Sequence, residues 1–209
     1  MIGIIDYGMG NLRSVQKAVE FLGGKAVITA EKSELNKCGR LILPGVGSFA
    51  AGIENLEKTG LSDYVKARVG ELPILGICLG MQFLLDESEE EGVHKGLGLI
   101  PGRAVRFTEG KVPQMGWNAV SDMRSPLFAG IRDGSQFYFV HSYYAATTDE
   151  YTIGKTEYYE PEIGRASCRE RVYVRFRHRQ RPCVRRAVPP RKERRSRAAA
   201  HAQFHEVIR

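Results

Sequence analysis

The feature that most constrains the fold is an apolar run that leads into a cysteine flanked by glycines, in the stretch Pro73–Gln82 (PILGICLGMQ). A strand that stops at such a turn, with a helical pattern after it, is typical of a nucleophile elbow. A Cβ at Gly76 or Gly80 would crowd this turn. The dipole of the following helix is expected to lower the pKa of the Cys78 thiol below its free value of about 8.5. We therefore interpret Cys78 as a nucleophile rather than as a small core residue.

Apolar runs alternate with helical patterns along the first part of the chain. Strands are expected at Ile2–Ile5, Ala26–Ile28, Leu41–Leu43 and Pro73–Ile77, and helices at 12–22, after the N-cap Ser48, and at Leu61–Val69. This alternation predicts an α/β fold with a doubly wound, mostly parallel sheet. In such sheets the site lies at the carboxyl ends of the strands. The turn Asp6–Asn11, the turn Pro44–Gly47 and Cys78 all fall there, which predicts one shared site.

The turn Pro44–Gly45–Val46–Gly47 has the composition of an oxyanion loop. Its two glycines allow backbone N–H groups to turn toward a developing negative charge. Taken alone, the turn suits an ordinary strand end equally well. Beside the elbow we favour the oxyanion interpretation.

The charge of the chain changes abruptly near Pro161. Residues 1–160 carry 16 Lys+Arg and 20 Asp+Glu, whereas residues 161–209 carry 15 Lys+Arg and 4 Asp+Glu. The length suits one α/β domain over residues 1–160. Four cysteines without paired or metal-type spacing, no signal peptide and no membrane-length apolar run predict a reduced, cytoplasmic protein that does not enter a membrane.

Several motifs in residues 1–160 resemble those of one family. They resemble the glutaminase subunits of imidazole glycerol phosphate synthase, within the class I (triad) glutamine amidotransferases. The motifs are Asp6–Leu12 (DYGMGNL), Leu43–Gly47 (LPGVG), Gly76–Gln82 (GICLGMQ), His94–Gly98 (HKGLG), Gln114–Asn118 (QMGWN) and Phe139–Tyr143 (FVHSY).

The resemblance implies a flavodoxin-like fold and a thioester mechanism. Cys78 would attack the side-chain amide of L-glutamine, and no cofactor or metal would be needed. The residues implied to form the oxyanion site and to hold the substrate are Gly45, Val46, Gly47, Leu79, Gln82, Glu90, Ser142 and Tyr143. The acidic run Glu89–Glu91 would otherwise suit a solvated surface, and only the motif register selects Glu90.

The resemblance also implies a partner. Ammonia would pass to a cyclase subunit with a (β/α)₈ barrel, in a heterodimer that makes imidazole glycerol phosphate and an aminoimidazole carboxamide ribotide for histidine biosynthesis. Asn11, Trp117 and Tyr138 would face that cyclase, although the two aromatic residues would also suit a core. His141 follows a strand-like Phe-Val pair, so we interpret it as structural rather than as the catalytic base.

A cysteine nucleophile needs a base that accepts its proton and later protonates the leaving amine. In the resembled family a His-x-Glu pair in a Gln-Phe-His-Pro-Glu-Lys stretch does this. The sequence contains no such stretch, because Gln203–Glu206 (QFHE) lacks the proline and we interpret it as coincidence. The recorded chain is therefore expected to have little or no glutaminase activity.

The tail suggests why the motif is missing. Glu162–Tyr173 (EIGRASCRERVY) resembles a translated sequencing adapter. For Arg186–Arg194 (RAVPPRKER), permitted codons read one base later give Val-Gln-Phe-His-Pro-Glu-Lys-Ser. We interpret residues 161–209 as an adapter scar followed by a frameshifted C-terminus that disrupts the end of the fold. His178, His201 and His205 receive no role.

Three alternatives remain. A glutaminase of another synthase would share the elbow, although the Asp6–Leu12 and Gln114–Asn118 motifs argue against it. A non-catalytic scaffold that binds the cyclase would not need the base. An Arg-rich tail could bind nucleic acid, but this one lacks interleaved aromatic residues, and we predict no nucleic-acid partner.

Overall fold

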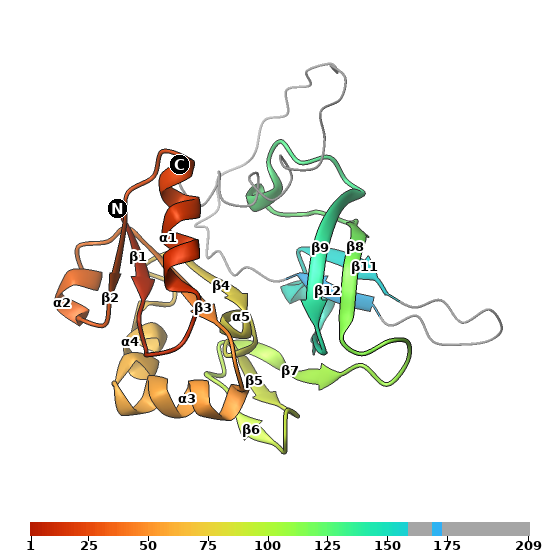
Figure 1. Cartoon of the computed structure of the whole chain (residues 1–209), viewed down its shortest axis with the longest axis horizontal. Helices are drawn as coiled ribbons and strands as arrows, with labels where there is room; N and C mark the ends of the chain where they lie inside the picture. Colours follow the sequence, from red (N-terminus) through yellow and green to blue (C-terminus); the bar gives the residue numbers. More distant parts are fainter. Residues whose placement is uncertain (159–168, 173–209) are drawn as a thin grey trace.

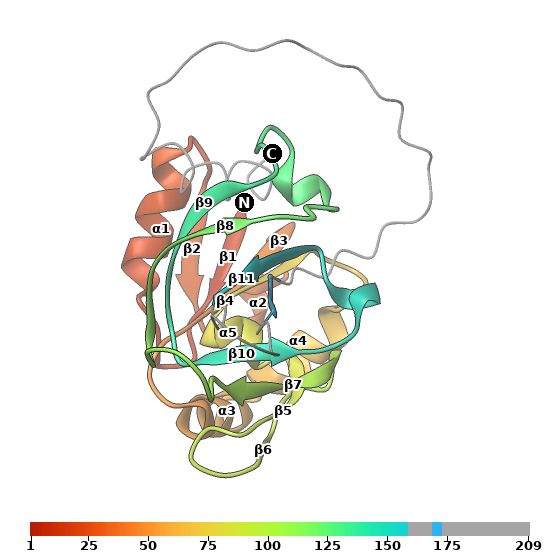
Figure 2. The ribbon, with the colours of Figure 1, turned by 90° about the vertical axis from the view of Figure 1, so that its right-hand side faces the viewer.

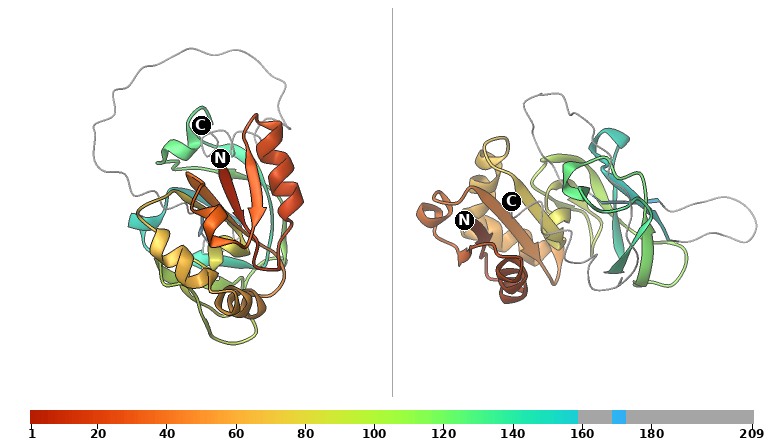
Figure 3. Two further views of the ribbon diagram at one scale, coloured as in Figure 1. Left: turned by 90° about the vertical axis from the view of Figure 1, so that its left-hand side faces the viewer. Right: turned by 90° about the horizontal axis from the view of Figure 1, so that it is seen from above.

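The computed structural model describes residues 1–158 and 169–172 (Figure 1). Most of the segment 161–209, with the interpretation of its origin, lies outside the described residues; the strand β12 (Arg169–Val172) is the one part of it that is described. In the view from above, the elements up to β4 gather at one end and β8, β9 and β11 at the other (Figure 3, right).

The first half of the chain forms a parallel sheet with the strand order β2-β1-β3-β4. Its strands are β1 (Ile2–Ile5), β2 (Ala26–Thr29), β3 (Arg40–Gly45) and β4 (Ile74–Cys78). Its helices are α1 (Leu12–Phe21), α2 (Lys32–Leu35), α3 (Phe49–Lys58) and α4 (Leu61–Arg68). The predicted alternation of strands and helices around a mostly parallel sheet is confirmed.

Local sequence signals set the helix ends. The Ser48 hydroxyl accepts a hydrogen bond from the Ala51 N–H at 3.4 Å, as an N-cap should. At the end of α1, Gly23 has a φ of +81° and its N–H donates to Glu20 O, while the Gly24 N–H donates to Val19 O. These bonds satisfy carbonyls that the end of the helix leaves open, which explains the Gly-Gly pair.

Side chains on the two faces of the sheet pack against different helices. On one face Ile5, Leu41 and Leu43 pack with buried residues of α2, α3 and α4. On the other face Ile4, Ile42 and Leu75 pack with Val19 of α1 and with Leu127. Burial on both faces explains why these strands are continuous apolar runs.

The second half adds strands that run mostly antiparallel. One sheet has the order β10-β7-β5-β6, in which β5 and β7 are parallel and the other pairs antiparallel. Strands β8 and β9 form a long antiparallel hairpin, visible side by side in Figure 2. The remaining bounds are α5 (Leu79–Gln82), β5 (Leu85–Ser88), β6 (His94–Lys95), β7 (Ile100–Arg106), β8 (Gln114–Val120), η1 (Pro126–Phe128), β9 (Ser135–His141), β10 (Tyr143–Ala146), η2 (Asp149–Tyr151) and β11 (Gly154–Glu157).

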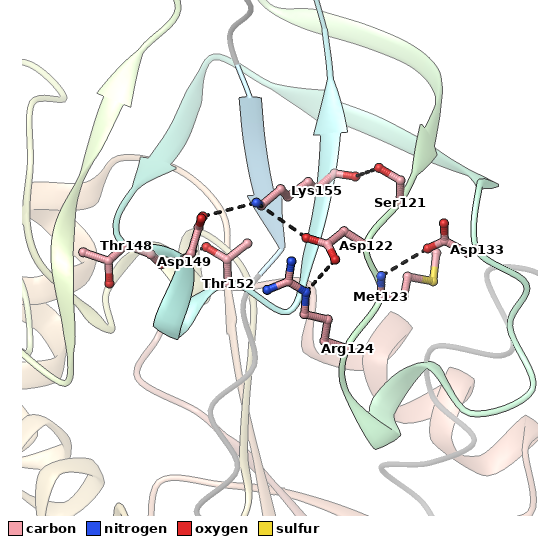
Figure 4. A network of polar contacts seen from close by, with 9 residues as sticks. All are labelled: Ser121, Asp122, Met123, Arg124, Asp133, Thr148, Asp149, Thr152 and Lys155. Carbon is pink, nitrogen blue, oxygen red and sulfur yellow. Dashed lines mark hydrogen bonds and ion pairs between the residues drawn. The ribbon is translucent and has the colours of Figure 1, made fainter. Parts of the chain in front are cut away.

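An ionic network holds the segment that connects β8 to β9 against β11 (Figure 4). The Lys155 ammonium lies 3.5 Å from an Asp122 carboxylate oxygen and 3.2 Å from one of Asp149. Arg124 donates to the other Asp122 oxygen at 2.5 Å. This hydrogen bond, with Lys155 as a further positive neighbour, lowers the pKa of Asp122. The network joins β8 to η2 and β11 through side chains as well as through backbone.

Within the described part of the chain, no helix has the length and apolar character needed to cross a membrane.

Candidate active site

Cys78 ends β4 in a strained turn. It is exposed and has a φ of +54°, in the left-handed region that non-glycine residues rarely occupy. A Cβ on Gly76 would lie 2.5 Å from Met81 Cα, and one on Gly80 would lie 1.9 Å from Leu43 O. Both glycines are therefore required by close backbone approach. The thiol is presented at the apex of the turn.

The helix after the elbow is shorter than the sequence pattern suggests. α5 spans only Leu79–Gln82, which is about one turn. Electrostatic stabilisation of a Cys78 thiolate would therefore come from the N–H groups of that single turn rather than from a long helix.

The glycine-rich loop after β3 lies directly beside the elbow. Gly45 pairs with Cys78 in the β3–β4 ladder, and a Cβ on Gly45 would lie 2.5 Å from Gly80 N. Gly47 has a φ of +95°, and Val46 between them is exposed. The expected oxyanion loop and the expected nucleophile, 33 positions apart, are thus brought together at the carboxyl end of the sheet.

Glu90 is the member of the acidic run that turns toward this loop. Its carboxylate accepts a hydrogen bond from the Phe49 N–H at 2.6 Å, at the start of α3 and two residues after Gly47. A carboxylate there is favoured by the exposed N–H groups of the helix. Glu89 instead pairs with Arg103 at 3.1 Å. Burial raises the pKa of Tyr143, and the charge of Glu90 raises it further.

The other residues expected to hold substrate have structural contacts. Gln82 is buried at the end of α5. The Ser142 carbonyl accepts from the Phe107 N–H at 3.0 Å, which ties it to the end of β7.

His141 is engaged through both ring nitrogens. Nδ1 lies 2.9 Å from Tyr143 O, and Nε2 lies 2.7 Å from Gln114 Oε1. The ring therefore fastens β9 to β8, which agrees with the structural interpretation of this histidine.

The expected partner-facing residues are on the surface. Asn11 is exposed, and the side chains of Trp117 and Tyr138 are 51% and 54% exposed. The two rings are cross-strand neighbours whose centroids lie 5.5 Å apart. The alternative that they are core aromatics is wrong.

Two residues of this surface were not anticipated. Met115 and Val140 are 60% and 54% exposed and face each other in the same hairpin. Their position every second residue from Trp117 and Tyr138 is the signal that could have found them. We call Met115, Trp117, Tyr138 and Val140 the hairpin face.

The sequence also matches known proteins. Residues 4–183 match the family described as glutamine amidotransferase class-I. A protein of Geobacillus thermodenitrificans named imidazole glycerol phosphate synthase subunit HisH is 47% identical over 182 residues, covering 83% of this chain and 85% of its own. A protein of the same name from Methanocaldococcus jannaschii is 51% identical over 160 residues, covering 76% of this chain and 81% of its own.

Solved structures support the fold. A crystal structure of a glutamine amidotransferase aligns with a TM-score of 0.60 at 21% identity, over 74% of this chain and 79% of that one. A putative GMP synthase component from Thermoplasma acidophilum aligns with a TM-score of 0.56 at 22% identity, over 74% of this chain and 72% of that one.

Proposed function

The chain belongs to the class-I glutamine amidotransferase family, and we propose that it is the glutaminase subunit of an imidazole glycerol phosphate synthase, which releases ammonia from L-glutamine for histidine biosynthesis. The observation that carries this proposal is the pairing of Gly45 with Cys78, which sets an oxyanion loop against a strained, exposed nucleophile. Sequence identity of 47% to 51% with proteins named imidazole glycerol phosphate synthase subunit HisH favours this subunit over other members of the family.

The chemistry requires a nucleophile, oxyanion donors and a proton carrier. The Cys78 thiolate forms a bond to the amide carbon, and the amide oxygen takes up negative charge. N–H groups of the loop Gly45–Gly47 and of Leu79 stabilise that charge. The C–N bond then breaks, the leaving nitrogen takes a proton and departs as ammonia, and water hydrolyses the thioester to glutamate.

Substrate recognition rests on groups near the same loop. We assign Glu90 to the substrate amino group, because its carboxylate already lies at the start of α3 beside the oxyanion loop. We assign Tyr143, whose pKa is raised by burial and by the charge of Glu90, to the same part of the substrate. Gln82 and Ser142 complete the set assigned to the amino-acid part of glutamine.

The proton carrier is the part that the recorded chain lacks. We propose that residues 161–209 replace a segment with the His-x-Glu pair, so that the recorded chain has an incomplete triad. Among the described strands, β4 pairs only with β3, so its other edge is open to a strand ending near Cys78.

We further propose that the hairpin face binds the cyclase subunit, giving a heterodimer in the cytoplasm. Four large apolar side chains on one face of an exposed hairpin are typical of a protein interface. The unpaired spacing of the four cysteines suits a reducing compartment.

Removing the two aromatic rings should weaken docking. The double variant Trp117→Ala/Tyr138→Ala is expected to weaken binding to the cyclase subunit by about a hundredfold, because buried aromatic residues dominate interface energies. Calorimetric titration of the cyclase into the chain measures this. Phe21→Ala, which truncates another exposed ring at the far end of α1, is the control and should bind normally. Equal binding by the double variant would place the interface elsewhere.

Selective labelling tests the glutamine site without needing the base. The glutamine analogue 6-diazo-5-oxo-L-norleucine is expected to alkylate Cys78 with saturable kinetics, and L-glutamine should protect. Buried Cys38, whose pKa burial raises, should stay unmodified and serves as an internal control. Mass spectrometry of the digested protein locates the label. Non-saturable labelling, or none, would contradict a glutamine site at Cys78.

A second candidate is a scaffold that binds the cyclase without chemistry. The hairpin face favours it, because docking needs no base. Protection by L-glutamine in the labelling experiment would separate a substrate site from a bare scaffold.

A further inference from the structure

The turn after β1 lies along the oxyanion loop. The Tyr7 hydroxyl donates to Pro44 O at 2.8 Å, although the two residues are 37 positions apart. A Cβ on Gly47 would lie 2.8 Å from the end of the Met9 side chain, and one on Gly10 would lie 3.5 Å from the Pro44 ring. The turn Asp6–Asn11 therefore contacts the loop at both of its ends.

Pro44 depends on such outside contacts. Proline has no N–H, so it cannot donate to the β3–β4 ladder. On one side the Leu43–Pro44 backbone rests against Gly80, where a Cβ would lie 3.0 Å from the Pro44 carbonyl carbon. Tyr7 supplies a hydrogen bond to the same carbonyl group. The Pro44 carbonyl group, which begins the oxyanion loop, is thus packed against the elbow and hydrogen-bonded by the Tyr7 hydroxyl.

The Tyr7 ring has little freedom to move. It is 2% exposed and meets the Phe83 ring edge-on, with centroids 5.8 Å apart. Phe83 in turn packs on Phe49 at 5.3 Å and fills the space above Gly52, where a Cβ would lie 2.2 Å from its ring. Because the packing fixes the ring, the hydroxyl position is fixed too. A Phe at position 7 would keep the packing and lose only the hydrogen bond.

The hydroxyl is also a permanent donor. Burial raises the pKa of Tyr7, and the nearby charge of Cys78 raises it further. The phenol therefore keeps its proton at neutral pH.

We propose that Tyr7 is a positioning residue for the oxyanion loop. Its hydroxyl holds the Pro44 carbonyl so that the N–H groups of Gly45, Val46 and Gly47 are presented toward the carbonyl that Cys78 attacks. This rests on the proposed glutaminase function. In this role Tyr7 acts through the loop.

The test compares two alkylating agents on the full chain. Tyr7→Phe is expected to slow alkylation of Cys78 by saturating 6-diazo-5-oxo-L-norleucine about tenfold, as the loss of one well-placed hydrogen bond would. The analogue carries a ketone where glutamine has its amide carbonyl. Its half-saturating concentration, and the rate and pH midpoint of alkylation by iodoacetamide, should not change. Iodoacetamide reports thiolate reactivity without needing the oxyanion loop.

Tyr64→Phe is the matched control. Tyr64 lies on α4 and is 7% exposed, and its hydroxyl donates to Asn36 Oδ1 at 3.0 Å. In Tyr64→Phe, the analogue should alkylate Cys78 at the same rate as in the parent chain. A second measurement is amide exchange, which should accelerate over residues 45–48 in Tyr7→Phe and not in Tyr64→Phe.

Three results would overturn the proposal: an unchanged analogue rate in Tyr7→Phe, an equal slowing with iodoacetamide, or an equal slowing in Tyr64→Phe. Absence of saturable, glutamine-protected labelling in the parent chain is a different result. It would refute the glutaminase function itself, and the role of Tyr7 with it.

Discussion

Replacing residues 161–209 by the C-terminal segment of the M. jannaschii relative is expected to raise glutamine hydrolysis about a thousandfold over the recorded chain, with the cyclase present. The graft would restore a base that takes the Cys78 proton and returns it to the leaving nitrogen, and such proton transfer typically contributes 10²- to 10⁴-fold. The proposed nucleophile and the proposed oxyanion loop already lie together in the described residues. Coupled detection of glutamate measures the rate.

Two variants of the graft serve as controls. Cys78→Ala should abolish hydrolysis while cyclase binding persists, because the hairpin face is untouched. Exchange of the grafted histidine for asparagine should return the rate to that of the recorded chain. If the recorded 209-residue chain hydrolyses glutamine within about tenfold of the graft, the tail contains a working base and the proposed incomplete triad is wrong.

Gly80→Ala should have the largest effect on stability. Its new Cβ would lie 1.9 Å from Leu43 O, and its nearest neighbours are all backbone atoms of Leu43 and Pro44, so no flexible side chain can move aside. Such overpacking should cost about 3 kcal/mol or more of unfolding free energy. Urea unfolding followed by circular dichroism measures the loss, and Cys78 should lose its saturable labelling.

Gly39→Ala is the matched control for that variant. Gly39 precedes β3 and is exposed, and a Cβ added there would meet no atom within 4 Å beyond its chain neighbours. The change should alter stability by less than about 1 kcal/mol. A Gly80→Ala protein as stable as Gly39→Ala would mean that the elbow can open without cost.

Local patterns predicted the first half of the fold well. The strand Ile2–Ile5 and the helix capped by Ser48 form at the predicted places, because apolar runs and caps act over a few residues. The sharp turn at Cys78 was also predictable, since its glycines are adjacent in sequence.

Contacts between distant segments could not be predicted in this way. The bond from Tyr7 to Pro44 joins residues 37 positions apart, and no periodicity marks it. The choice of Glu90 from three consecutive glutamates depends on where α3 begins, which only the folded chain decides. The hairpin Gln114–His141 was expected only as motifs, because its strands alternate weakly between apolar and polar residues.

The open edge of β4 makes this protein a natural starting point for a split reporter. The proposed nucleophile, the proposed oxyanion loop and the hairpin face all precede residue 159, and among the described strands β4 pairs on one side only. A synthetic peptide carrying the Phe-His-Pro-Glu sequence, added to a fragment of residues 1–158, would supply the missing strand and the base in one step. Ammonia release would then report the meeting of the two pieces, and fusing each piece to one member of a protein pair would turn association of that pair into a colour change.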